Sequence, residues 1–102
     1  MKDDGRTQTQ EVITWREITI RITFEPDRLN MGYTAHLELH SVQPEKAKLP
    51  VTETGYRSHF RSIERFEEFG GPAAYVLEWL DDAATSKEWK AHDAASKQLP
   101  LF

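Results

Sequence analysis

An alternation of apolar and polar residues in the first part of the chain constrains the fold more than any other feature. Its apolar positions are Ile18, Ile20, Ile22, Phe24, Tyr33, Ala35, Leu37 and Leu39. A period of two in β-branched and aromatic residues is typical of strands with one buried face. The sequence therefore predicts half-buried strands over residues 11–24 and 33–42, with Pro26 ending the first segment.

The first of these segments changes parity in its middle. Ile13 and Trp15 are out of step with the isoleucines that follow. A bulge or a tight turn near Arg16 and Glu17 would place both halves on one face. Residues 11–24 could therefore form a bent strand or a hairpin.

A further strand is expected at 51–60, after a polar loop between two prolines. Here the apolar pattern puts Tyr56 and Phe60 inward and Arg57 and His59 outward. Strands joined by short links favour an antiparallel meander with one face in water.

Helical signals begin after the last expected strand. Ser62 can cap a short helix through Phe69, and Gly70-Gly71 ends it. Pro72 suits the first turn of a second helix, and a capping box at Thr85 and Glu88 suggests that this helix breaks and restarts, reaching about Ser96. The helical apolar stripe consists of Val76, Leu77, Leu80 and Ala84. We predict an α+β fold in which a three- to four-stranded antiparallel meander is followed by C-terminal helices, forming a two-layer sandwich.

Three parts of the chain can be distinguished. Residues 1–10 are polar and unpatterned, which predicts a disordered tail. Residues 11–96 have the length of a single α+β domain. Residues 97–102 form either a linear motif or a tail docked on that domain.

The chain has no cysteine, which excludes disulfides and thiolate metal sites. It has no signal-like segment and no run of about 20 apolar residues, so no membrane contact is expected and a cytoplasmic location fits best. No nucleophile motif, phosphate-binding loop or dinucleotide fingerprint occurs. These observations favour a non-enzymatic protein without a cofactor.

The net charge of −4 comes from the C-terminal part of the chain. Residues 1–61 hold nine acidic and nine basic residues, whereas residues 62–102 hold eight acidic and four basic ones. A broad basic surface is absent, which makes direct nucleic-acid contact unfavourable. The acidic helical residues could instead mimic a phosphate track, as in a mobile-element inhibitor. They are Glu64, Glu67, Glu68, Glu78, Asp81 and Asp82.

Histidines on the expected polar sheet face suggest two alternatives. His36, Glu38 and His40 project to one side of a strand, and His59 could join them to hold a metal ion in a metal-dependent enzyme. The same face could be a nucleic-acid-associated surface, although its aromatic residues are expected to point inward, where they cannot stack on bases. A solvated polar face explains the pattern better than either alternative, because polar residues alternate along such a face by default and this spacing is common by chance.

The last residues carry the most specific functional signal. Gln98, Leu99, Leu101 and Phe102 resemble the pentapeptide by which many bacterial DNA polymerases and repair factors bind the β sliding clamp. Pro100 departs from the small or acidic residue usual at the middle position. The resemblance implies that Gln98 makes an edge contact and that the other three fill a hydrophobic cleft. The alternative is a tail packed beside Trp79 or Trp89.

The segment Leu49–Phe60 also resembles part of small uncharacterised proteobacterial proteins, some of them plasmid-borne. No activity follows from that resemblance. The hypothesis that we prefer from the sequence is a non-enzymatic protein-binding module that engages the bacterial sliding clamp through its C-terminal peptide.

Overall fold

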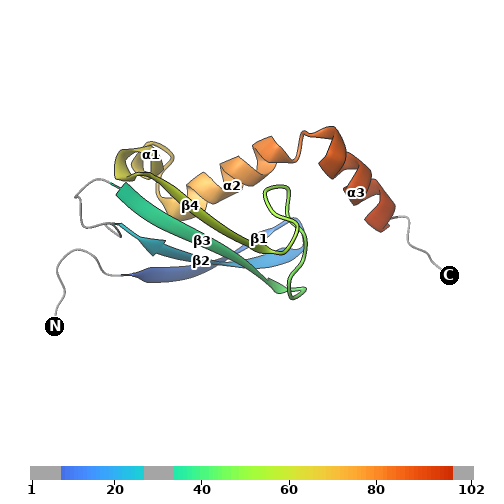
Figure 1. Ribbon diagram of the computed structural model, residues 1–102, viewed down its shortest axis with the longest axis horizontal. Coiled ribbons are helices and arrows are strands. Elements are labelled where there is room, and N and C mark those ends of the chain that lie inside the picture. The colour runs from blue at the N-terminus through green and yellow to red at the C-terminus, as the bar shows by residue number, and fades with distance from the viewer. Residues whose placement is uncertain (1–7, 27–33, 98–102) are drawn as a thin grey trace.

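The computed structural model describes residues 8–26 and 34–97. Four strands form one antiparallel sheet in the order β1-β2-β3-β4, and three helices follow (Figure 1). The elements are β1 (Thr9–Trp15), β2 (Ile18–Glu25), β3 (Thr34–Gln43), β4 (Tyr56–Ser62), α1 (Ile63–Glu68), α2 (Pro72–Ala83) and α3 (Lys87–Lys97). This architecture confirms the predicted α+β meander with C-terminal helices.

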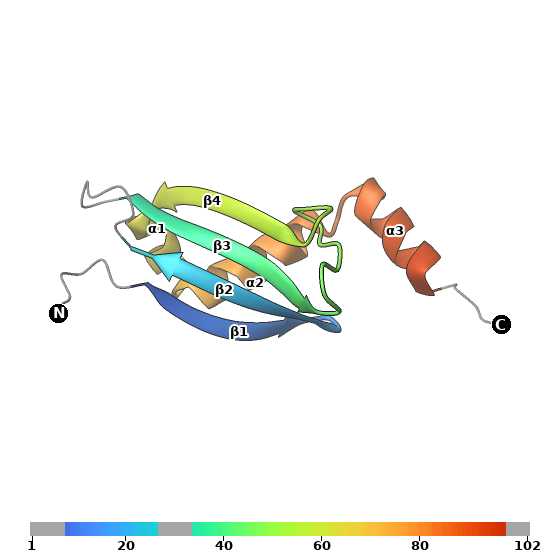
Figure 2. The same ribbon diagram turned by 60° about the horizontal axis from the view of Figure 1, so that its bottom comes forward.

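The helices α1 and α2 cover one face of the sheet, and the other face is left open (Figure 2). The helix α3 extends beyond the end of the sheet (Figures 1 and 2). Within the part of the chain that is described, no helix has the length and apolar character needed to cross a membrane.

A two-residue turn joins β1 to β2. Trp15 pairs with Ile18 across it, and Arg16 adopts a left-handed φ of 52°. The turn brings Ile13 opposite Ile20, so both lie on the covered face despite their different parity. The tight-turn alternative is therefore confirmed, and β1 begins at Thr9, within the segment expected to be a tail.

The core lies between the covered face and α1 and α2. Its largest fully buried side chains are Ile20, Ile22, Leu37, Leu39, Leu49, Phe66, Val76 and Leu80. Burying each such side chain contributes about 1.5–3 kcal/mol. The indole N–H of Trp15 donates to Asp81 Oδ1 at 2.9 Å. This hydrogen bond connects the turn between β1 and β2 to the last turn of α2.

The expected orientation of the last strand is wrong. In β4, Tyr56 is 43% exposed and Phe60 41% exposed, whereas His59 is only 7% exposed. Phe60 pairs with His36 and His59 pairs with Leu37, so His59 shares the covered face with Leu37. Hydrophobicity assigned the aromatic residues to the core, but α2 supplies polar and aromatic partners that make burial of the imidazole possible. The strand also starts later than the predicted residue 51, at Tyr56. Residues 49–52 instead form a turn, in which the backbone groups of Leu49 and Thr52 bond to each other.

The predicted helix boundaries hold, with two corrections at their caps. Pro72 is at the first turn of α2. Ser62 stands at the N-cap position of α1, but its side chain makes no capping hydrogen bond. The break before α3 is present, but Ser86 rather than Thr85 caps it: the backbone N–H of Trp89 donates to Ser86 Oγ at 3.1 Å. Thr85 instead donates to the carbonyl of Asp82 at the end of α2.

Candidate binding surface on the open face of the sheet

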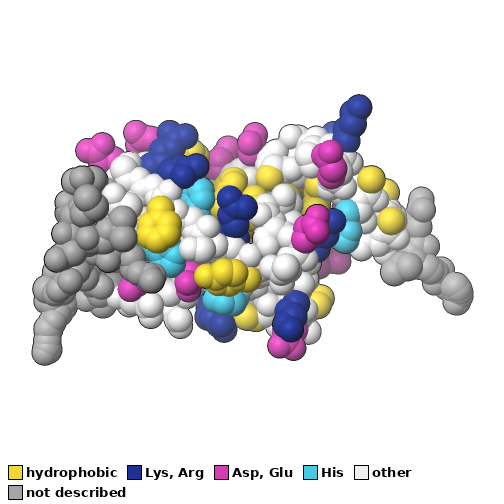
Figure 3. Space-filling view, viewed as in Figure 1, with side chains coloured by type: hydrophobic (Ala, Val, Ile, Leu, Met, Phe, Trp, Pro, Cys, Tyr) yellow, Lys and Arg dark blue, Asp and Glu magenta, His cyan; other side chains and the backbone are white. Residues whose placement is uncertain are grey.

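The open face is the side of the sheet opposite α1 and α2, and it combines exposed aromatic rings with charged and hydroxyl groups. Register places on it Val12, Arg21, Thr23, Glu25, His36, Glu38, His40, Tyr56, Ser58 and Phe60. The large hydrophobic side chains that are exposed in the described part of the chain are Val12, Tyr56 and Phe60, all on this face. Figure 3 shows exposed hydrophobic side chains lying beside histidines on this side of the molecule.

Two cross-strand ring pairs hold these aromatic residues in place. The ring centroids of Phe60 and His36 are 4.4 Å apart, and those of Tyr56 and His40 are 4.8 Å apart. The hydroxyl of Tyr56 also donates to Glu38 Oε2 at 3.0 Å. Each aromatic ring of β4 is therefore fixed against a histidine of β3 while one side stays accessible.

His36 is nearly buried beneath this layer and links three strands. Its Nε2 lies 2.7 Å from Ser58 Oγ on β4, and its Nδ1 lies 3.6 Å from Glu25 Oε1 on β2. A hydroxyl, an imidazole and a carboxylate in this order are the parts of a hydrolytic triad. The 3.6 Å between His36 Nδ1 and Glu25 Oε1 is too long for a hydrogen bond. The Phe60 ring also packs against the imidazole of His36. The arrangement supports the sheet rather than indicating catalysis.

The structure separates His59 from the other three residues considered for a metal site. His36, Glu38 and His40 lie on the open face with the partners described above, whereas His59 lies on the opposite face. Among the described residues, no group of three histidine, aspartate or glutamate side chains could hold a metal ion.

His59 is enclosed between β4 and α2. Its Nε2 lies 2.9 Å from the hydroxyl of Tyr75, and its ring centroid is 4.2 Å from that of Trp79. Burial, with smaller contributions from Arg61 and Arg57, lowers the pKa of His59 from 6.5 to about 4. The imidazole is neutral at pH 7 and acts as a structural polar group.

The acidic helical residues are all exposed. They lie on two helices, α1 and α2, which are separated in the sequence by the Gly70-Gly71 break, where φ is 95° and 114°. Asp81 accepts the Trp15 indole N–H, and Glu68 pairs with Arg65 at 3.3 Å. Part of the acidic surface thus has a structural role.

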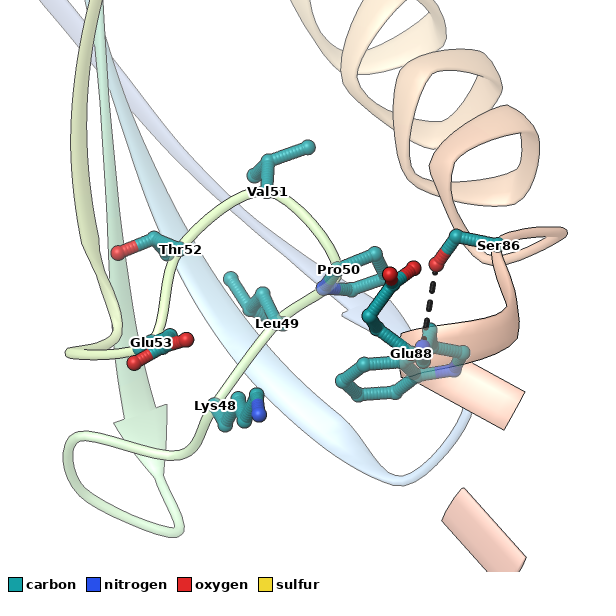
Figure 4. A pocket seen from close by; sticks show the side chains of 9 residues that line it. Lys48, Leu49, Pro50, Val51, Thr52, Glu53, Ser86 and Glu88 are labelled. Atoms are coloured by element: carbon teal, nitrogen blue, oxygen red, sulfur yellow. Dashed lines mark hydrogen bonds between the residues drawn. The ribbon is translucent and has the colours of Figure 1, made fainter. Parts of the chain in front are cut away.

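Two clefts flank Trp89 at the start of α3. One, of about 340 Å³, lies between α3 and the loop that carries Leu49 and Pro50 (Figure 4). The other, of about 640 Å³, lies between α3 and the hairpin turn at Arg16. The candidate clamp-binding residues Gln98, Leu99, Leu101 and Phe102 lie outside the described residues.

Sequence reasoning did not identify the aromatic residues of the open face as site residues. The signal that could have found them is the interleaving of Tyr56, Arg57, His59, Phe60 and Arg61 in one strand. Arg57 and Arg61 lie four residues apart, so they share one face of the strand, but this spacing does not tell which face. The register against β3 decides which side chains of β4 are buried.

Comparison with known proteins supports a family assignment. Residues 8–89 match the family described as the KlcB third domain, which covers the whole sheet, α1, α2 and the start of α3. No curated protein and no solved structure gives a significant match. Because the match spans most of the chain, this protein belongs to the KlcB third domain family.

Proposed function

We propose that this chain is a non-enzymatic protein-binding module and that the open face of its sheet is the binding surface. The observation that carries the proposal is the pair of exposed rings, Tyr56 and Phe60, each fixed against a histidine of β3. Aromatic side chains that are ordered before binding lose little entropy on binding and are common anchors of protein interfaces.

The charges of this face favour a protein partner over nucleic acid. Arg21 is accompanied by Glu25 and Glu38, so the face carries both signs. The chain as a whole has a net charge of −4. Nucleic-acid binding depends on neutralising several phosphates with an excess of basic residues. A mixed surface around aromatic anchors is typical of a protein interface.

The test is affinity capture from the native host with three forms of the full chain. The wild type is compared with a Tyr56→Ser, Phe60→Ser double variant and with a Glu67→Lys, Glu68→Lys double variant of the acidic helix. All four positions are exposed, so each variant is expected to fold, which thermal unfolding verifies. Nuclease treatment during capture separates protein from nucleic-acid partners.

We expect one or more proteins to be retained by the wild type and the α1 variant and lost from the aromatic variant. Equal retention by the aromatic variant would contradict the proposal. Loss from the α1 variant alone would favour the phosphate-mimicking alternative, and nuclease-sensitive retention would favour a nucleic-acid partner.

The C-terminal peptide is a second candidate interaction site, for the bacterial sliding clamp. The observation that favours it is the position of α3, which carries the chain beyond the end of the sheet (Figure 1). A clamp-bound peptide would then leave the aromatic surface available for another partner. Surface plasmon resonance with immobilised clamp tests this idea: Leu101→Ala with Phe102→Ala should abolish binding without changing thermal stability. Undiminished binding by that variant would exclude the peptide.

A further inference from the structure

Among the described residues, the strand β4 ends the sheet, so no strand of residues 8–26 or 34–97 lies beside its outer edge. The direction of its backbone groups follows from Tyr56. The Tyr56 N–H donates to Thr54 Oγ1 at 3.4 Å, and its carbonyl accepts from Thr52 Oγ1 at 2.7 Å. Both hydroxyls belong to the loop before β4 rather than to β3. The backbone groups of Tyr56 therefore point away from β3.

Backbone direction alternates along a paired strand. The N–H and C=O groups of Ser58 and Phe60 and the N–H of Ser62 must therefore also point to the free edge. The carbonyl of Ser62, the N-cap of α1, instead accepts the first hydrogen bond of that helix. The threonines close this edge only at Tyr56. Beyond it, the carbonyl of Phe60 accepts a hydrogen bond from Arg61 Nη1 at 2.8 Å, a side chain that can rotate away. A short free edge thus runs over residues 58–62.

Two arginines flank this edge on the helix-covered side. Arg57 and Arg61 are exposed, and no carboxylate among the described residues lies within 4 Å of either guanidinium. Arg57 donates to the carbonyl of Val51 at 3.2 Å. Four residues of strand separate the two charges by about 13 Å. On the other side of the same strand lies the exposed ring of Phe60.

A second copy of this chain is a poor occupant of the edge. Antiparallel pairing of two β4 strands centred on His59 would put Arg57 of each copy opposite Arg61 of the other. Like charges directly opposite each other destabilise strand pairing. An acidic segment would instead place a carboxylate opposite each arginine, which is favourable both for pairing and for the speed of association.

We propose that residues 58–62 bind an extended acidic segment of a partner protein as a fifth, antiparallel strand. This proposal rests on the proposed protein-binding function and specifies its partner. In chain order the segment has an acidic residue opposite Arg61, an apolar residue opposite Phe60, two spacer residues, and an acidic residue opposite Arg57. Main-chain hydrogen bonds supply affinity in this mode of recognition, and alternate side chains supply specificity.

The probe is a synthetic peptide, Thr-Glu-Val-Thr-Thr-Glu, titrated into the isotopically labelled full chain and followed by NMR. We expect chemical-shift changes at the amides of Ser58, Phe60 and Ser62. Replacing both glutamates of the peptide by lysine, or making Arg57→Glu with Arg61→Glu, should weaken binding about tenfold or more. The lysine peptide should recover binding to the charge-reversed protein.

Two N-methylated peptides separate strand addition from simple surface binding. The valine N–H would point toward β4, so N-methylvaline should abolish binding. The N–H groups of the glutamates would point away, so N-methylation there should have little effect. This comparison leaves the protein unchanged and does not depend on the folding of a variant.

The absence of shifts at the edge amides with millimolar peptide would overturn the proposal, as would equal binding of the two N-methylated peptides. If partner capture is lost with Tyr56→Ser and Phe60→Ser but survives Arg57→Glu and Arg61→Glu, the open face remains the interface and strand addition is wrong. If both double variants still capture the partner, the proposed protein-binding function of the open face is itself wrong.

Discussion

The burial of His59 predicts a specific loss of stability in mild acid. Its pKa is about 4 in the folded protein against an ordinary value of 6.5. Between these values the unfolded chain binds a proton that the folded chain does not, so the stability associated with neutral His59 is fully present above pH 6.5. It is lost as pH falls toward 4. At about 1.4 kcal/mol per pKa unit, the shift corresponds to a loss of about 3 kcal/mol.

Urea unfolding at several values between pH 7 and pH 4 measures this effect, with tryptophan fluorescence as the signal because Trp79 packs on His59. His59→Gln keeps a polar group near Tyr75 but cannot titrate. The difference in unfolding free energy between wild type and His59→Gln should therefore shrink by about 3 kcal/mol from pH 7 to pH 4.

Tyr75→Phe is the matched control, since it removes the hydroxyl beside Nε2 and leaves the imidazole in place. Its stability should keep falling with pH as in the wild type. A gap between wild type and His59→Gln that stays constant from pH 7 to pH 4 would refute the reasoning, because His59 would then titrate alike in the folded and unfolded chains.

Other contacts give further predictions, all measurable by urea unfolding at pH 7. Gly55→Ala should cost at least about 2 kcal/mol, because φ is 81° and the new Cβ would lie 2.8 Å from backbone atoms of Lys46. Gly71→Ala meets no atom within 4 Å of the new Cβ but forces alanine into a φ of 114°, so it should cost about 1–3 kcal/mol from backbone strain alone; an unchanged stability would contradict the strain argument. Trp15→Phe removes the hydrogen bond to Asp81 and should lower the free energy of unfolding by about 1.5–3 kcal/mol. An unchanged free energy of unfolding would show that this hydrogen bond does not stabilise the fold. Ser86→Ala should cost about 1 kcal/mol through the cap of α3, and NMR shifts showing an unchanged first turn would argue against it.

Much of the fold could be predicted because local patterns and tertiary packing agree. The isoleucines of β2 and the leucines of β3 alternate cleanly, and Pro72 begins α2 after a glycine pair. Each of these signals depends only on neighbouring residues. The sequence also indicated the hairpin turn at Arg16, through the change of parity around it.

The candidate site could not be predicted, because it depends on the register between β3 and β4. In β4, Tyr56 and Phe60 compete with His59 for the covered face, and local hydrophobicity favours the aromatic residues. The outcome is decided by Tyr75 and Trp79, which are distant in sequence and provide a hydrogen-bonding and stacking environment for a neutral imidazole. A shift of one residue in a strand exchanges its two faces. The open aromatic surface is the consequence.

The most direct test of the binding surface is site-specific photo-cross-linking in the native host. A photoreactive phenylalanine analogue is placed in the full chain at position 60, with position 67 on α1 as the matched exposed control. We predict a discrete protein adduct at position 60 that is absent at position 67 and insensitive to nuclease. Adducts at position 67 alone, or none at position 60, would contradict the assignment of the open face as the interface.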